Sequence, residues 1–279
     1  MRAFRFIAAS LLAAIVTVAF ADPQPSPKEV NPRAAVPFAV GERLLYSVKW
    51  DPPWYLFFLP SMEAGQIDLH LLGETEYKGK KALKISFQVH SSGSLAKMAG
   101  LKIDDDFVFF TEPNTFCTLG LSKKIREGKR KRQIDVDYIR DAGQLHIREF
   151  DESVEPPQLK KDETKNDIPA CVQDPLSAVY FFRLSQLQEK HAQNFLVGHD
   201  DRIKEITARV EKHEIVETPA GRFPAWRVTV ASLMGGLFKE GGQFKIWVSA
   251  DEKKMPVQFE FKVRMGRVLG KLVRQQNEQ

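Results

Sequence analysis

The stretch that decides the fold is VQFEFKVR, residues 257–264, in which apolar and polar residues alternate without a break. Its odd-numbered positions are Val or Phe, and its even-numbered positions are Gln, Glu, Lys or Arg. Such a period of two predicts a β-strand with one buried face and one face in water. Because parallel strands are usually covered on both faces, the polar face indicates an antiparallel sheet.

The same alternation recurs along most of the chain, in residues 44–50, 67–71, 83–89, 134–138, 226–230 and 244–248. We therefore expect about a dozen strands, more than an open twisted sheet holds without curling or splitting. The predicted fold is mainly β: a strongly curved antiparallel sheet, either a half-barrel or a barrel, with an apolar concave side.

One helix interrupts the strand pattern, in DPLSAVYFFRLSQL at the start of residues 174–190. Asp174 can cap its first turn and Pro175 suits the first helical position. Apolar residues follow at helical spacing, with Arg183 as the exception, so we expect this helix at the mouth or on the concave side of the sheet. Residues 151–170 before it are charged and broken by proline, which predicts a long surface loop.

The N-terminus, MRAFRFIAASLLAAIVTVAFAD, resembles an export signal. Arg2 and Arg5 precede an apolar segment that ends in a small-x-small site, which predicts a signal peptide over residues 1–21, cleaved after Ala21. An uncleaved membrane anchor is the alternative reading. Residues 22–37 are rich in proline and predict a disordered lead-in, followed by a single β domain over 38–272 and a short tail, 273–279.

The composition fits an ordinary globular protein, with 43% hydrophobic and 28% charged residues. A formal net charge of +5 is too mild to indicate a nucleic-acid partner. Cys117 and Cys171 are the two cysteines, and in an oxidising compartment they can form a disulfide. Two buried thiols are the other reading, and the sequence leaves both open.

If the first strands form a meander, the first, third and fifth turns share one end of the sheet. The first turn, between two prolines, is apolar, and the fifth is basic. We predict that the apolar side chains contact a lipidic ligand or membrane: Trp54, Tyr55, Leu56, Phe57, Phe58 and Leu59 of turn one, with Leu95, Met98 and Leu101 of turn three. We predict that the basic ones contact an anionic surface: Lys123, Lys124, Arg126, Lys129, Arg130, Lys131 and Arg132.

Two plainer interpretations stay open for these turns. The aromatic segment can fold inward and plug the hollow of the sheet, and a basic hairpin tip can simply be solvated. In the same way, phenylalanines such as Phe259 and Phe261 can fill a closed core or line a ligand cavity.

Several segments, taken in order, resemble one bacterial cell-envelope family. They are PFAVGERLLYSVKW followed by EAG, then DPLSAVYFFRL, ETPAGRFPAWRV, FKIWVSADEKKMPVQFEF and RMGRVLGKL. Together they look like the family called domain of unknown function 3108, over residues 38–272. The resemblance implies an antiparallel β protein of the periplasm, similar to the half-barrels that carry lipoproteins, with no established activity and no catalytic residues to transfer.

Motifs that would support an enzyme are missing from the sequence. There is no G-x-S-x-G segment, and no two histidines have metal-ligand spacing. We therefore predict no catalytic residue, no cofactor and no metal. The leading hypothesis is a non-enzymatic periplasmic protein that binds or shields a lipidic ligand or a lipoprotein and contacts a membrane. The alternatives are a glycan- or lipid-processing hydrolase that uses Asp104, Asp105 and Asp106, and an assembly partner in an envelope complex.

Overall fold

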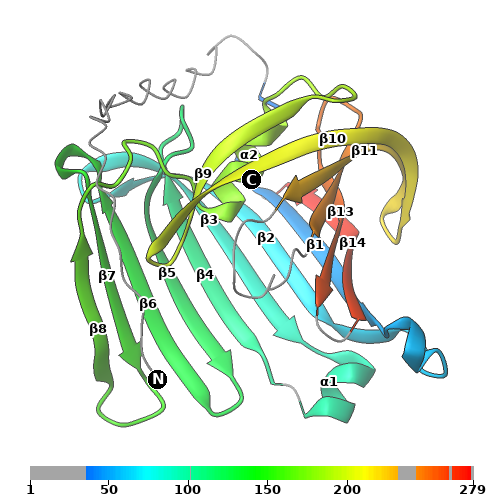
Figure 1. Ribbon diagram of the computed structural model, residues 1–279, viewed down its shortest axis with the longest axis horizontal. Helices are drawn as coiled ribbons and strands as arrows, with labels where there is room; N and C mark the ends of the chain where they lie inside the picture. Colours follow the sequence, from blue (N-terminus) through cyan, green and yellow to red (C-terminus); the bar gives the residue numbers. More distant parts are fainter. Residues whose placement is uncertain (1–35, 101, 232–242, 264–265, 278–279) are drawn as a thin grey trace, which may run out of the picture.

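A computed structural model describes residues 36–100, 102–231, 243–263 and 266–277 of the chain. These residues form one antiparallel sheet of 14 strands that curls into a barrel-like shape (Figure 1). The strands are β1 (Glu42–Asp51), β2 (Met62–Tyr77), β3 (Lys80–Ser91), β4 (Asp104–Thr111), β5 (Thr118–Glu127), β6 (Arg130–Ile139), β7 (Gln144–Asp151), β8 (Gln158–Lys165), β9 (Ala192–His199), β10 (Arg202–Thr218), β11 (Gly221–Ala231), β12 (Gln243–Ser249), β13 (Pro256–Val263) and β14 (Gly266–Asn277). The predicted fold class is confirmed, with 14 strands where about a dozen were expected.

The strands pair in the order β8-β7-β6-β5-β4-β3-β2-β1-β14-β13-β12-β11-β10-β9. The first and last strands therefore lie side by side in the middle of the sheet, while β8 and β9 are its two ends. The sheet is curved but not closed. No helix among the described residues is long and apolar enough to cross a bilayer. The predicted signal peptide, residues 1–21, and most of the lead-in lie outside the described residues.

Residues 257–263 of the deciding stretch lie in β13, and the apolar face of this strand points to the concave side. Phe259 contacts the ring of Tyr46, with ring centroids 5.6 Å apart, and stands opposite Gly270 of β14. A side chain at Gly270 would clash, because a Cβ there would lie 2.0 Å from the Phe259 ring. Glycine is needed here because an aromatic ring crosses directly over the backbone.

Inward-facing side chains are fully buried at one end of the strands and only half-buried toward the other end. In β3, Ile85 is fully buried whereas Phe87 is half-buried, and in β13 Val257 is buried whereas Phe259 and Phe261 are half-buried. The buried ends of the strands are those nearest the helix α2 (Pro175–Arg183). One end of the concave side is thus filled, and aromatic side chains at the other end keep accessible surface.

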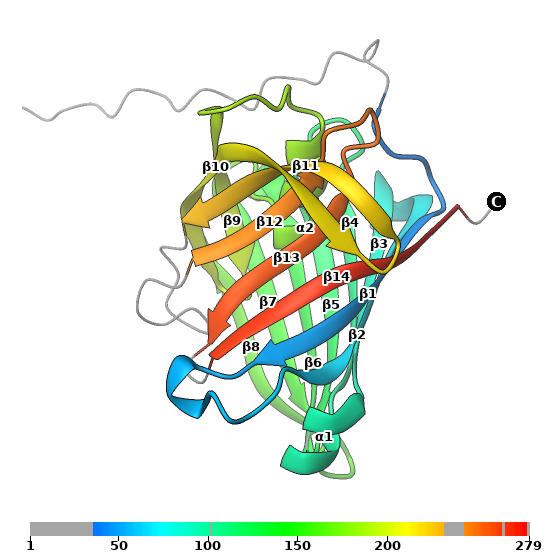
Figure 2. The same ribbon diagram turned by 90° about the vertical axis from the view of Figure 1, so that its right-hand side faces the viewer.

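Helix α2 lies on the concave side of the sheet, as predicted (Figure 2). Asp174 caps it by accepting hydrogen bonds from the N–H groups of Leu176 and Ser177, both at 2.9 Å. The helix ends at Arg183, so the expected extension to residue 190 is wrong. Arg183 faces the interior and not water, because it forms a fully buried ion pair with Glu42 of β1.

Three further expectations about the elements need correction. The predicted loop 151–170 contains β8, whose charged side chains suit an edge strand that water reaches. The predicted tail is not separate, since β14 continues to Asn277 through its pairing with β1. The third turn contains a helix that was not expected, α1 (Gly93–Ala99), which ends at Gly100 in the left-handed conformation.

The structure joins Cys117 and Cys171 in a disulfide, with their Cα atoms 5.1 Å apart. The bond ties the start of β5 to the segment that leads into α2. Next to it, the N–H of Thr118 donates a hydrogen bond of 2.8 Å to the carbonyl of Val172. The disulfide therefore holds a connecting segment against the sheet, at the end that α2 fills.

Candidate functional site

The connections that follow β1, β3, β5 and β7 all lie at the end of the barrel away from α2, as Figures 1 and 2 show for the β1–β2 connection, α1 and the β5–β6 turn. We call this end the rim; it comprises residues 52–61, 92–100, 128–129 and 152–157. The meander order of β1 to β8 produces this arrangement, because each hairpin reverses the chain. Trp54 and Arg130 therefore lie at the same end of the molecule.

The aromatic loop, residues 54–59, projects its largest side chains into solvent. The exposed fractions of Trp54, Phe57 and Phe58 are 87%, 85% and 68%, and that of Tyr55 is 48%. Leu56 and Leu59 are half-buried. The rings associate in pairs, Trp54 with Tyr55 at 5.9 Å and Phe57 with Phe58 at 6.1 Å between centroids. The inward-plugging interpretation is therefore wrong for these four aromatic residues.

The base of the aromatic loop is fixed to the sheet. A short 3-10 helix, η1 (Trp54–Leu56), follows Pro53. Asp51 accepts hydrogen bonds of 2.5 Å from Ser61 and 2.5 Å from Arg267, closing the loop across β1 and β14. Burial alone would raise the pKa of Asp51, but these two partners outweigh it and hold the pKa below its usual value. The four exposed aromatic rings thus lie on a loop whose base has a fixed position at the rim.

Helix α1 adds a smaller apolar contribution beside this loop. Met98 is 64% exposed, whereas Leu95 is half-buried and Ala96 is buried against the sheet. Gly93 has a positive φ of 82°, and a Cβ there would lie 2.5 Å from Glu63 of β2, so the helix starts very close to that strand. Leu101, which was predicted with them, lies outside the described residues.

The basic residues of the fifth turn divide into two groups. Lys124, Lys129, Arg130 and Lys131 are exposed at the turn between β5 and β6, and Arg126 is half-buried beside them. Lys123 and Arg132 do not belong to the exposed tip, because the alternation of the strands turns them inward. Lys123 is 8% exposed and pairs with Asp200, and Arg132 pairs with Glu149 at 2.8 Å.

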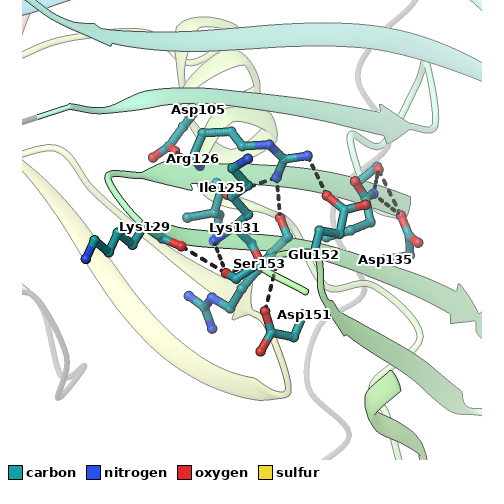
Figure 3. Close-up of polar contacts among 12 residues, drawn as sticks. Asp105, Ile125, Arg126, Lys129, Lys131, Asp135, Asp151, Glu152 and Ser153 are labelled. Atoms are coloured by element: carbon teal, nitrogen blue, oxygen red, sulfur yellow. Dashed lines mark hydrogen bonds and ion pairs between the residues drawn. The ribbon is translucent and has the colours of Figure 1, made fainter. Parts of the chain in front are cut away.

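Polar contacts hold this basic hairpin, residues 124–131, against the connection between β7 and β8 (Figure 3). The N–H of Lys131 donates to Ser153 Oγ at 2.9 Å, and Ser153 Oγ donates to the carbonyl of Lys129 at 3.0 Å. Arg126 donates to Glu152 and to the carbonyl of Ile125. The exposed lysines therefore extend from a hairpin that hydrogen bonds hold in place.

A surface pocket of about 410 Å³ lies between the end of β3, the start of β4 and the basic hairpin. Its lining comprises His90, Ser91, Lys102, Ile103, Asp104, Arg126 and Gly128. His90 Nδ1 and Asp104 Oδ1 are 2.5 Å apart. Lys102 is exposed, and it was not singled out from the sequence. Its place in the sequence, shortly after the apolar Leu95 and Met98 and the lysine between them, Lys97, is the signal that could have identified it.

The acidic triplet that an enzyme would use is divided between two faces of β4. Asp104 and Asp106 point outward and contact His90 and Gln88, whereas Asp105 points inward and accepts a hydrogen bond from the N–H of Arg126 at 2.7 Å. Burial raises the pKa of Asp105 above its ordinary value. The three carboxylates do not converge on one cleft. Within the described part of the chain, no group of three or more His, Cys, Asp or Glu is arranged to hold a metal.

Two solved structures match this chain. A crystal structure of a β-barrel-like protein of domain of unknown function DUF1849 from Brucella abortus matches with a TM-score of 0.57 and 13% identity, covering 88% of this chain and 100% of that chain. A Bacteroides fragilis protein with a YmcC-like fold gives a TM-score of 0.34 and 11% identity, over 85% and 96% of the chains.

At 13% identity the first likeness supports a β-barrel-like fold and nothing about activity. No curated protein sequence matches the chain. A family model matches residues 45–273, from within β1 to within β14, which includes β2 to β13 and both α-helices described above. The chain belongs to the family described as Protein of unknown function (DUF3108).

Proposed function

We propose that this protein is a non-enzymatic component of the bacterial cell envelope that acts in the periplasm. Its rim docks on an anionic membrane surface, and its concave side holds or shields a lipidic or otherwise apolar ligand. The ligand class includes the acyl chains of a lipoprotein.

The observation that carries the proposal is the exposure of Trp54, Phe57 and Phe58 on one projecting loop. Monomeric proteins rarely leave several large aromatic side chains together in water, and such patches mark contact sites. Moving one large apolar side chain out of water contributes roughly 1.5–3 kcal/mol. Three such side chains at a bilayer surface therefore supply enough free energy for reversible docking.

Charge at the rim favours a membrane over a protein as the occupant of this patch. Lys124, Lys129 and Lys131 extend from the basic hairpin, Lys97 lies in α1, and the exposed Lys102 follows α1 in the chain. Each lysine near an anionic bilayer adds about 1 kcal/mol, and aromatic rings with flanking cations suit the headgroup region. The rim combines both features on one end of the molecule.

The concave side supports the second half of the proposal. Phe87, Phe107, Phe259 and Phe261 point inward at the rim end and are half-buried, so they offer apolar surface next to the membrane-facing end. Phe259 and Phe261 stack with their centroids 6.3 Å apart. An acyl chain held on the concave side would cover these rings.

Vesicle co-sedimentation tests the docking. We expect the mature protein to pellet with vesicles that contain phosphatidylglycerol, and a Trp54→Ser, Phe57→Ser and Phe58→Ser triple variant to stay in solution. The matched control replaces three exposed apolar residues away from the rim, Ile139→Ser, Leu72→Ser and Ile215→Ser, which are 43%, 41% and 49% exposed. Equal pelleting of the rim variant and the parent protein defeats the proposal.

A protein partner is the competing occupant of the aromatic loop. If the rim variant loses a co-purifying envelope protein but neither form binds vesicles, the assembly-partner alternative replaces membrane docking. Mass spectrometry of organic extracts of the purified protein examines the ligand separately, and we expect a lipid with at least one acyl chain.

A further inference from the structure

The barrel wall has a gap between its two end strands. Within the described residues, no backbone ladder joins β8 to β9. The β9–β10 hairpin instead crosses the open side, and Figure 1 shows its turn in front of the wall that β5, β6 and β7 form. An isolated parallel bridge links Gln173 with Val197 of β9.

The tip of this hairpin meets the wall through charged groups. Lys123 Nζ of β5 lies 2.6 Å from Asp200 Oδ1. Lys161 and Lys165 of β8 lie 2.7 Å and 3.0 Å from Asp201 Oδ2, and Lys165 also donates to the Asp201 carbonyl at 3.0 Å. Two consecutive acidic residues of one turn are thus bound by three lysines from two strands.

These ion pairs differ in accessibility. The side chain of Lys123 is 10% exposed and that of Asp200 33%, whereas Lys165 is 39% and Asp201 25% exposed. Hydrogen bonds from Lys161 and Lys165 lower the pKa of Asp201 to about 2. Burial would raise the pKa of Asp200, but Lys123 outweighs it and lowers that pKa. Both carboxylates are therefore ionised at neutral pH, and salt can reach the outer pairs.

The body of the hairpin is held differently from its tip. Phe195 and Val197 are buried against the core that includes α2. Gln173 exchanges two backbone hydrogen bonds of 2.8 Å with β9, next to the Cys117–Cys171 disulfide. Apolar packing and a covalently fixed segment anchor the body, whereas ion pairs connect the tip to β5 and β8.

We propose that the β9–β10 hairpin is an electrostatically latched strap, whose release from the lysines of β5 and β8 opens the barrel wall and admits an apolar ligand to the concave side. This inference rests on the proposed ligand-holding function. The anchored body acts as the pivot, so release moves the tip and leaves the rim in place.

Distance measurements between the strap and β8 test the motion. Spin labels go on Thr164→Cys of β8 and Arg202→Cys of the hairpin, both exposed positions, while the native cysteines stay in their disulfide. We expect one short distance in the labelled parent. Asp200→Asn with Asp201→Asn should raise the fraction at longer distance by about two- to fivefold, as loss of partly exposed ion pairs predicts.

Two controls separate latch release from general damage. Asp68→Asn removes a partly exposed ion pair of 2.6 Å, with Arg43 of β1, in the middle of the sheet and far from the gap, and should leave the distance unchanged. Lys123→Asp should lengthen the distance, and Lys123→Asp with Asp200→Lys should restore it. An unchanged distance in the Asp200→Asn and Asp201→Asn variant overturns the strap, whatever the vesicle experiment shows.

Uptake of the fluorescent apolar probe N-phenyl-1-naphthylamine tests the entry route. We expect the uptake rate to rise about two- to fivefold in the latch variant, with the same final signal, because the ligand surface itself is unchanged. An unaltered rate in a variant whose strap has opened contradicts the entry route. Binding to vesicles should be the same in the latch variant and the parent, so failure of the latch and failure of the rim remain distinguishable.

Discussion

At the scale of single residues, the ion pair between Glu42 and Arg183 connects the helix to the sheet. Its two hydrogen bonds are 2.6 and 2.8 Å long, and both side chains are 1% exposed. Arg183 also lies over the rings of Phe38 and Tyr180, at 4.8 and 5.1 Å. Burial opposes the charge of Arg183, but Glu42 outweighs it and raises the pKa of Arg183. A charge so deeply buried depends on its partner.

Removing one member of this pair should be costly. We expect Glu42→Ala to lower the free energy of unfolding by about 3–5 kcal/mol, because Arg183 would be left buried and uncompensated. Chemical denaturation measures the change. Lys80→Ala, which removes the exposed pair with Asp141, is the control and should cost less than about 1 kcal/mol. A loss for Glu42→Ala as small as that of the control would contradict this account of the pair.

The sequence predicts some residues well and others poorly, for a physical reason. The sequence allowed Trp54 and Phe57 to point either into the hollow of the sheet or into solvent, and in the structure both are exposed to solvent. The inward direction of Lys123 was missed, although the pattern Leu119, Leu121, Lys123 carries it. The Glu42–Arg183 pair could not be predicted from the sequence, because its two residues are 141 positions apart and only the fold brings them together.

At the scale of elements, β8 and the basic hairpin show what hydrophobic pattern can and cannot predict. Central strands have one apolar face, and their alternation identifies them. Strand β8 is QLKKDETK, at the edge of the sheet, where both faces meet water or charged partners. Its pattern therefore looks like a loop, and only pairing with β7 shows that it is a strand.

The basic hairpin should act through its charge alone. We expect Lys124→Gln, Lys129→Gln and Lys131→Gln together to weaken binding to phosphatidylglycerol vesicles by about tenfold to hundredfold, because each lysine adds about 1 kcal/mol. The salt dependence of binding should weaken as well. A matched control removes exposed lysines at the opposite end, Lys81→Gln, Lys190→Gln and Lys253→Gln. If both triple variants lose the same affinity, the hairpin has no special role.

At the scale of the whole molecule, strand order determines which surfaces share an end. Counting hairpins in the sequence predicts that the first, third and fifth connections meet, and the pairing of β1 to β8 places them together. The pairing of β1 with β14 could not be read from the pattern, because alternation identifies strands without their neighbours. For the same reason the gap between β8 and β9, and the strap across it, became visible only in the structure.

The central claim is that the rim enters the headgroup region of an anionic bilayer with Trp54 leading. Quenching of Trp54 fluorescence by lipids brominated on the acyl chain measures this directly. The chain has four tryptophans, so the Trp54 signal is taken as the difference between the parent and Trp54→Phe. We predict quenching and a blue shift of this difference signal with phosphatidylglycerol vesicles, and neither in their absence. A Trp54 signal that the brominated lipid leaves unchanged while the protein is bound to the vesicles would contradict the account.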